Sequence, residues 1–438
     1  MPRNRRLLTV LRVLLAAIAL ISLDLFAWGQ SEYKTLHRFT KEGERGSEPT
    51  GGLVLDQKGN LYGATAGGGA HQSGTVFKLT QSPDGTWSEH VLYSFCSVNK
   101  CGDGSTPTAS LIFDASGNLY GTTVQGGANG VGTVFKLSPR SNGSWTESVL
   151  YSFCSANNCG DGWYPAASLI LDKAGNLYGT TEHGGILNCQ DGCGVVFKLT
   201  PSAGEGWSES VLYSFCSLTK CVDGAMPTAG LISDATGNLY GTTAYGGESA
   251  TNCDDIACGV AFKLKPNSDE SWTESVLYSF CTLKECSDGS VPLAGLILDN
   301  AGNLYGTTFD NFLSAGPGVV FQLTPSEDGT WRESVIYQFA SVPHGLYPEA
   351  GLVLDAVGNL YGTTYVGGDP SCYAIGCGAV FKLTPTSNGW RETVLHPFYD
   401  HPGGFPSAGV ILDGAGNLYG TTQGEGNGTF GSVFEITP

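Results

Sequence analysis

Short runs of apolar residues, broken by glycine, asparagine, aspartate and proline, recur along this chain in units of 56 to 65 residues. The unit around Gly117 contains four such runs, at 111–114, 118–123, 132–137 and 145–153. β-branched and aromatic residues dominate the runs, and turn-forming residues separate them. Each unit therefore predicts four short strands, and residues 30–438 show no amphipathic helical period.

The motif Gly-Asn-Leu-Tyr-Gly marks each unit and occurs seven times. Its copies start at Gly59, Gly117, Gly175, Gly237, Gly302, Gly358 and Gly416. A repeat of this length indicates an array of supersecondary units. Seven four-stranded units can close into a ring, so we predict an all-β, seven-bladed β-propeller of antiparallel blades over residues 30–438.

The two ends of the repeat region indicate how the ring closes. The fourth-strand pattern has six copies, at 91–95, 149–153, 211–215, 276–280, 335–339 and 394–398. The last unit reaches 436–438 after only its third strand, and a seventh copy lies at 35–39. We therefore expect the N-terminal strand to complete the last blade and to cover an otherwise open sheet edge.

The first 29 residues have the composition of a secretory signal peptide. Arg3, Arg5, Arg6 and Arg12 flank or precede an apolar run over 13–21, and small residues precede Gln30. A retained anchor helix is the alternative, although Asp24 shortens the apolar run below a comfortable span. We expect a mature chain without a membrane span, either secreted or periplasmic.

Fourteen cysteines agree with export because they form seven local pairs. The pairs are Cys96/Cys101, Cys154/Cys159, Cys189/Cys193, Cys216/Cys221, Cys253/Cys258, Cys281/Cys286 and Cys372/Cys377. Close pairs in an exported chain indicate disulfides. Four pairs fall in links from a fourth strand to the next first strand and three in loops from a second to a third strand, which emerge on the same face of an antiparallel blade. Zinc needs four converging ligands, and we expect these pairs to lie apart on separate blades.

The face that carries these pairs is the candidate binding surface, since loops on a rigid scaffold usually carry function. Trp163 and Tyr164, Tyr347, and Phe405 lie beside prolines of the links, and Asp161 belongs to the Asp-Gly pair after a cysteine pair. One interpretation is that the aromatic residues pack over loops and the aspartates form turns. The other is a platform for a carbohydrate or peptide ligand.

Charge narrows the range of partners. The chain has a net charge of −18, which becomes −21 without its first 29 residues because these carry four arginines and one aspartate. Such a protein should repel nucleic acid and anionic membranes. Calcium is a possible ligand, but the repeated aspartates of the first hairpins fit turns better, and Asp254-Asp255 is the densest acidic spot in the loops. We predict no resident cofactor.

Motifs for catalysis are missing from the sequence. It has no Gly-x-Ser-x-Gly elbow, no His-Glu-x-x-His and no phosphate-binding loop. The surface contains too many acidic residues to select a catalytic carboxylate pair. Two function classes follow: a non-enzymatic binding or scaffolding propeller, which is favoured, and a carbohydrate-active hydrolase or lyase that uses the same face.

The repeat unit resembles a known family. Its runs Leu-Asp-x-x-Gly-Asn-Leu-Tyr-Gly-Thr-Thr, Gly-Thr-Val-Phe-Lys-Leu and Val-Leu-Tyr-Ser-Phe are similar to the Gloeo/Verruco (GloVer) tandem repeat of choice-of-anchor proteins. The first unit has Ala64 where the second has Thr122, and the last has Glu435 in place of lysine. The resemblance implies an exported bacterial protein and no particular activity. We expect a monomer.

Overall fold

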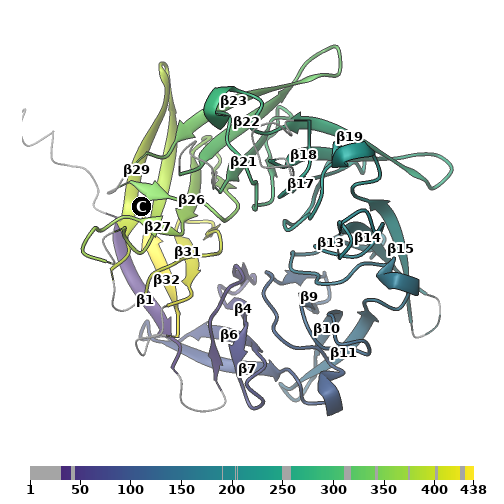
Figure 1. Cartoon of the computed structure of the whole chain (residues 1–438). Coiled ribbons are helices and arrows are strands. Elements are labelled where there is room, and N and C mark those ends of the chain that lie inside the picture. Colours follow the sequence, from purple (N-terminus) through teal and green to yellow (C-terminus); the bar gives the residue numbers. More distant parts are fainter. Residues whose placement is uncertain are drawn as a thin grey trace, which may run out of the picture.

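Seven antiparallel sheets of four strands stand like blades around a common centre (Figure 1). They are found in the part of the chain that the computed structural model describes: residues 31–40, 45–189, 191–202, 204, 206–248, 258–309, 317–340, 344–372, 375–399, 403–424 and 430–438. The second strand of each blade lies towards the centre and the fourth towards the outer rim. The prediction of a seven-bladed propeller is confirmed.

Each blade follows the chain from its inner to its outer strand. The first three blades are β3 (Val54–Leu55), β4 (Leu61–Thr65), β6 (Thr75–Gln81) and β7 (Trp87–Ser94); β8 (Ile112–Phe113), β9 (Leu119–Thr123), β10 (Thr133–Pro139) and β11 (Trp145–Ser152); and β12 (Ile170–Leu171), β13 (Leu177–Thr181), β14 (Val195–Pro201) and β15 (Trp207–Ser214). The next three are β16 (Ile232–Ser233), β17 (Leu239–Thr243), β18 (Val260–Pro266) and β19 (Trp272–Ser279); β20 (Ile297–Leu298), β21 (Leu304–Thr308), β22 (Val319–Pro325) and β23 (Trp331–Gln338); and β25 (Val353–Leu354), β26 (Leu360–Thr364), β28 (Ala379–Thr386) and β29 (Gly389–Pro397). The seventh is β30 (Ile411–Leu412), β31 (Leu418–Thr422), β32 (Ser432–Thr437) and β1 (Glu32–Arg38).

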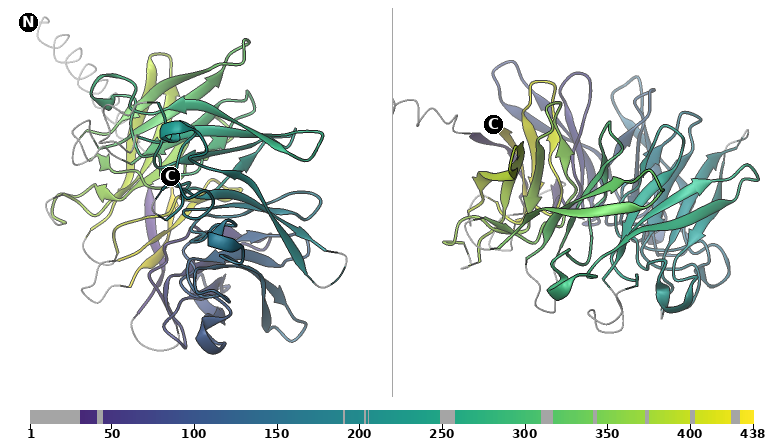
Figure 2. Two further views of the ribbon diagram at one scale, coloured as in Figure 1. Left: turned by 45° about the vertical axis from the view of Figure 1, so that its right-hand side comes forward. Right: turned by 90° about the horizontal axis from the view of Figure 1, so that it is seen from above.

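Short elements in the loops complete the described structure. Two small ribbons pair β2 (Gly46–Ser47) with β5 (Gly67–Gly68) and β24 (Gly345–Leu346) with β27 (Val366–Gly367). Four 3₁₀ helices are η1 (Asn99–Cys101), η2 (Asn157–Cys159), η3 (Thr219–Cys221) and η4 (Lys284–Cys286). Figure 2 shows the disc from its edge, with the 3₁₀ helices on one side and strand hairpins projecting on the other.

The predicted strands are found, with small differences in bounds and register. The first strand of the second blade keeps only Ile112–Phe113 of the run 111–114. In its fourth strand the register shifts between Val149 and Tyr151, so that Leu150 forms a bulge. The same shift occurs in the fourth strand of every blade that the structure describes, including β1.

The repeated motif forms a turn around the partly buried carboxylate of its aspartate. In the second blade, Asp114 Oδ1 accepts the backbone N–H groups of Ser116 and Asn118, at 2.8 and 2.9 Å. Its Oδ2 accepts the Asn118 side-chain amide and the Tyr120 hydroxyl, the latter at 3.1 Å. Burial raises the pKa of Asp114, but the four hydrogen bonds together outweigh burial and hold the pKa below its ordinary value. The aspartate is therefore a turn residue, as the sequence indicated.

The glycines of the motif are required for two different reasons. Gly117 has φ +80°, a conformation that residues with a Cβ rarely adopt. Gly121 has an ordinary φ, but a Cβ there would lie 2.7 Å from the Phe135 ring and 2.8 Å from Leu111. The first glycine makes the turn and the second lets the ring of the third strand pack against the second strand.

Hydrophobic clusters lie between neighbouring blades and hold the ring together. Phe95, after the fourth strand of the first blade, packs edge-on against Phe135 of the second at 4.9 Å between ring centroids. At the junction of the chain ends, Phe39 packs in the same way on Phe77 at 5.2 Å. β1 pairs with β32 from Glu32↔Thr437 to Arg38↔Ser432. Closure by the N-terminal strand is therefore confirmed.

Candidate functional site: the stapled face

The disulfides gather on the face formed by the links between blades and the loops from second to third strands, which we call the stapled face. Six predicted pairs are bonded: Cys96–Cys101, Cys154–Cys159, Cys189–Cys193, Cys216–Cys221, Cys281–Cys286 and Cys372–Cys377. Cys253 of the seventh pair lies outside the described residues. Each 3₁₀ helix ends at the second cysteine of a link.

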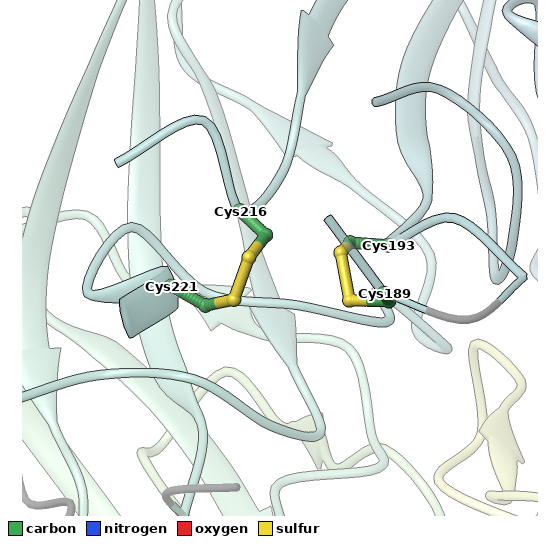
Figure 3. A group of neighbouring side chains, drawn as sticks. All are labelled: Cys189, Cys193, Cys216 and Cys221. Carbon is green, nitrogen blue, oxygen red and sulfur yellow. A yellow bond between two sulfur atoms is a disulfide. The ribbon is translucent and has the colours of Figure 1, made fainter. Parts of the chain in front are cut away.

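Two disulfides of the third blade come together, which corrects the expectation that all pairs lie apart. The sulfur atoms of Cys189, Cys193, Cys216 and Cys221 all lie within 4.8 Å of one another (Figure 3). The first pair comes from the loop after β13 and the second from the link after β15. They meet because both segments emerge on the same face of one blade. The two pairs lie in loops that are separated by two strands in the sequence, so the sequence alone did not predict their contact.

The residue before each link proline adopts a left-handed conformation, which sequence reasoning missed. The seven residues are Glu48, Thr106, Tyr164, Met226, Val291, Tyr347 and Phe405, with φ between +54° and +63°. Such a conformation costs a residue with a Cβ roughly 1–2 kcal/mol. Their mixed side chains gave no sequence signal beyond the following proline.

Backbone hydrogen bonds between blades explain why this conformation persists. The N–H of Tyr164 donates to Val131 in the preceding blade at 3.0 Å, and its carbonyl accepts the N–H of Glu182 in the next blade at 3.1 Å. The link therefore ties two blades through its backbone and leaves the side chain at this position free to vary. A ligand-binding residue can be placed there without disturbing the fold.

Two predicted aromatic residues form one group of rings in the link before the third blade. Trp163 lies 4.5 Å from the ring of His183 and donates its indole N–H to the carbonyl of Asp191 at 3.2 Å. Tyr164 lies edge-on to Trp163 at 6.4 Å. Both side chains are partly exposed. The structure thus brings Trp163 and Tyr164 together and adds His183.

The other two predicted aromatic residues belong to a second group. Tyr347 lies 5.3 Å from Phe309, and Phe405 lies 5.3 Å from Tyr365, while Phe405, Tyr347 and Tyr365 share one hydrophobic cluster. Phe405 is only 6% exposed, whereas Tyr347 is partly exposed. Packing accounts for much of the Phe405 ring, and Tyr347 offers more of its surface to a ligand.

Asp161 lies beneath the surface of the same face. Its side chain is 2% exposed, and its Oδ2 accepts the Tyr151 hydroxyl at 2.7 Å and the Ser155 N–H at 2.8 Å. Its Oδ1 accepts the Ala156 N–H at 3.1 Å. The carboxylate therefore holds the link, and direct contact with a ligand would require these hydrogen bonds to break.

A partly buried glutamate from the next blade faces each of four such aspartates. The pairs are Glu147 with Asp103, Glu209 with Asp161, Glu274 with Asp223, and Glu333 with Asp288. Burial, together with the neighbouring aspartate charge, raises the pKa of each glutamate to about 7. The Oε1 atom of each is buried without a hydrogen-bond partner in the described structure. The repeated Trp-x-Glu of the fourth strands was the sequence signal that could have revealed them.

Two links without a cysteine pair place Arg45 or His344, instead of an aspartate, near the corresponding glutamate. Glu89 lies 3.3 Å from His37 and 3.7 Å from Arg45, and its side chain is 1% exposed. Glu392 lies 2.9 Å from His344. A cavity of about 650 Å³ opens beside Glu89 and is lined also by Arg45, His71 and His90. Charge at this interface therefore differs from that at the four aspartate interfaces.

Two further observations concern metals and membranes. Among the residues described, the groups of three or more potential metal ligands are two cysteine clusters: the four cysteines of the third blade, and Cys258, Cys281 and Cys286 of the fourth. Asp254 and Asp255, considered for calcium, lie outside the described residues. None of the described helices is long and apolar enough to cross a membrane.

Comparisons with known proteins agree with the repeat and the fold. The model of the Gloeobacter/Verrucomicrobia repeat matches residues 25–253 and 252–438. No curated protein matches the sequence. Among solved structures, a fungal alcohol oxidase of the AA5 family in complex with copper has 12% identity and a TM-score of 0.54, over 94% of this chain and 77% of that one.

Two other structures are less similar. The polysaccharide lyase Uly1 has 10% identity and a TM-score of 0.46, over 94% of this chain and 93% of that chain. PorZ, a bacterial surface component of the type-IX secretion system of Porphyromonas gingivalis, has 12% identity and a TM-score of 0.43, over 86% and 46%. At these identities the likeness concerns the fold alone.

Proposed function

Because this chain belongs to the Gloeobacter/Verrucomicrobia repeat family, we propose that it is an exported bacterial protein that acts as a non-enzymatic binding or scaffolding propeller. Residues 1–29 would direct export, and the bonded cysteine pairs suit an extracellular or periplasmic compartment. The mature protein would act as a monomer. Its negative charge disfavours nucleic acid as a partner.

The observation that carries this proposal is the left-handed link residue. The fold fixes its backbone between two blades and leaves its side chain unspecified, and the chain places Tyr164, Tyr347 and Phe405 at three of the seven positions. A ring held on such a backbone loses little conformational entropy on binding. Trp163 and His183 enlarge the first of these sites into a partly exposed aromatic group.

The proposed ligand is a carbohydrate or a peptide. Both present apolar faces that stack on aromatic rings and polar groups that bond to exposed backbone and imidazole groups. The group of Trp163, Tyr164 and His183 would make the main contact, and Tyr347 would form a second one, with the largely buried Phe405 as a minor part of it. Asp161 would support the first group from below by holding the link through its hydrogen bonds.

A glycan and peptide array with the purified protein, with and without calcium, tests this proposal. A hit should bind more weakly to W163A/Y164A while the melting temperature stays nearly unchanged. M226A is the matched control, because Met226 has the same left-handed position in another link but no ring. An array without hits, or W163A/Y164A binding as tightly as the unaltered protein, would contradict the proposal. So would a large loss of stability with unchanged binding.

A carbohydrate-active hydrolase or lyase is the second candidate. The observation that favours it is the cavity beside Glu89, where a buried carboxylate, two histidines and Arg45 line one hollow. Glu89 also lies 3.3 Å from His37, which does not line the cavity. A carboxylate paired with an imidazole in this way can move a proton to or from a substrate. Release of reducing ends from a polysaccharide, abolished in Glu89→Gln, would support this candidate against the first.

A further inference from the structure

We propose that Cys189, Cys193, Cys216 and Cys221 form a tetrathiolate site for zinc, or another soft divalent cation, when their two disulfides are reduced. This inference is independent of the ligand proposed for the aromatic groups. It rests on the contact between two cysteine pairs of the third blade, seen in Figure 3.

The geometry of the four sulfur atoms is close to that of a metal centre. All four lie within 4.8 Å of one another. Zinc bound to four thiolates at about 2.3 Å places them about 3.8 Å apart at the corners of a tetrahedron. On metal binding, the two sulfur atoms of each former disulfide would move from about 2 Å to about 3.8 Å apart. Sulfur atoms of different pairs would approach each other by up to about 1 Å.

The two segments have the spacing and the freedom that such a movement needs. Three residues separate Cys189 from Cys193 and four separate Cys216 from Cys221, within the range of two to four that structural zinc sites use. Gly192 and Gly194 flank Cys193 with φ of +78° and +86°. Glycine adjusts its backbone without a Cβ clash, so Cys193 can turn towards a shared ion.

Burial gives the site an inner and an outer side. Cys193 and Cys216 are buried, at 0% and 3% exposed, and pack with Phe215 in one hydrophobic cluster. Cys189 and Cys221 are partly exposed. A reductant and an ion can therefore reach the outer sulfur atoms, while the inner ones shield the bound ion from water.

The chemistry requires a reductant, which we take to be a phosphine or a dithiol. Each disulfide accepts two electrons and two protons, so reduction of both gives four thiols and oxidises two equivalents of reductant. Binding of one divalent ion then forms four metal–sulfur bonds and releases up to four protons. Affinity should consequently rise with pH until the thiols are ionised.

Other blades provide an internal comparison. The pairs Cys96–Cys101 and Cys154–Cys159 lie in the links of the first and second blades, whose second-to-third loops contain no cysteine. In the fourth blade, the sulfur atoms of Cys258, Cys281 and Cys286 also lie within 4.8 Å of one another. A cluster therefore forms where one blade has a cysteine pair both in its second-to-third loop and in the link that follows it.

The test compares two variants that each keep four cysteines. In one, only Cys189, Cys193, Cys216 and Cys221 remain, and the other ten are serine. In the other, only Cys96, Cys101, Cys154 and Cys159 remain. Both variants are reduced with a water-soluble phosphine in the absence of oxygen and are then titrated with Co²⁺. The first should bind one cobalt per chain with the visible d–d and near-ultraviolet charge-transfer bands of a tetrahedral tetrathiolate, and Zn²⁺ should displace it.

The outcomes separate the proposal from nonspecific binding. Equal cobalt spectra in both variants, or no tetrathiolate spectrum in the first, would overturn it. Circular dichroism reports whether the reduced chains stay folded, and a first variant that unfolds and fails to refold on addition of metal would overturn it as well. Two further variants keep the remaining twelve cysteines. After reduction, C189S/C193S should bind one cobalt fewer than the unaltered chain, and C96S/C101S should bind the same number.

Discussion

The hydroxyl of Thr421, in the last blade, donates a hydrogen bond to the carbonyl of Gly51, ahead of the first blade, at 3.1 Å. Both groups are buried, and 370 residues separate them along the chain. The same bond joins other neighbouring blades, from Thr122 to Ala167, Thr180 to Ala229, Thr242 to Ala294, Thr307 to Ala350, and Thr363 to Ala408. The first blade has Ala64 at this position and cannot form the bond.

We predict that Ala64→Thr stabilises the protein. The new hydroxyl should reach the carbonyl of Ala109, the counterpart of Ala167, and a net hydrogen bond contributes about 1 kcal/mol. The side chain should fit because six other blades hold threonine in the same surroundings. Thermal or denaturant unfolding would measure the gain. Thr122→Ala is the matched control and should lose a similar amount, whereas a lower melting temperature for Ala64→Thr would show that the first interface is packed differently.

The N-terminal strand should be required for cooperative folding. Removal of residues 30–40 exposes the edge of β32 and takes Leu36 and Phe39, 8% and 2% exposed, out of the closing interface. We expect a lower melting temperature and a broader transition. A truncated chain that melts like the intact one would contradict closure as a source of stability.

A single substitution tests the same interface without removing the strand. Phe39→Ala should cost about 3–5 kcal/mol, as expected for a buried ring. Phe153 has the same position at another interface, where it packs on Phe197 at 5.0 Å. Phe153→Ala should therefore cost a similar amount. A much smaller cost at Phe39 would mean that the closing interface is looser than the others, and urea unfolding measures both.

The repeat let the sequence predict most of the fold. Turn aspartates such as Asp114, the glycines of the motif and the alternating strands act locally, so their roles follow from neighbouring residues. Counting fourth strands was sufficient to predict the closure between β1 and β32. Glu435, where five described blades have lysine over the tyrosine ring, still contacts that ring's hydroxyl, at 3.0 Å from Tyr419.

The candidate sites depend on contacts between blades or between loops of one blade, which the sequence of a single unit does not reveal. The left-handed φ of Tyr164 is imposed by hydrogen bonds to two blades. Cys193 and Cys216 are separated by a whole strand pair, and their proximity follows only from the side of the blade on which each loop emerges. Likewise, the Glu209–Asp161 pair joins a fourth strand to a link of the preceding blade. The first and third of these follow from the packing of neighbouring blades, and the second from the folding of one blade.

The disulfide pairs should each join near neighbours and make local contributions to stability. Peptide mapping of the purified protein should find the six described pairs and Cys253 bonded to Cys258, with no free thiol. C154S/C159S should lower stability by about 2 kcal/mol, because the loop is short. A disulfide between cysteines of different blades would contradict the arrangement, since disulfides need Cα atoms closer than about 7 Å.

Stability should fall as pH rises through 7. The pKa of Glu209 is raised to about 7 in the folded protein, from 4.5 as its ordinary value, by burial and by the charge of Asp161. The folded state therefore retains a proton that the unfolded state has lost, and this contribution is complete below about pH 4.5 and lost above about pH 7. The turn aspartates act oppositely: hydrogen bonds lower the pKa of Asp114, so its contribution disappears only in stronger acid. Maximum stability is expected between these limits.

Glu209→Gln should consequently raise the melting temperature at pH 8 and leave it nearly unchanged at pH 5. The amide resembles the protonated carboxyl and removes the repulsion from Asp161, and we expect a gain of roughly 1 kcal/mol after allowance for solvent screening of a partly buried group. Glu392→Gln is the matched control: its carboxylate lies 2.9 Å from His344 instead of an aspartate, so neutralising it should bring no gain at pH 8. The measurement is the melting temperature of both variants and of the unaltered protein between pH 5 and pH 8. Equal gains in both would show that desolvation alone, and not the facing aspartate, destabilises these glutamates, whereas no gain for Glu209→Gln would show that its carboxyl is ionised without cost.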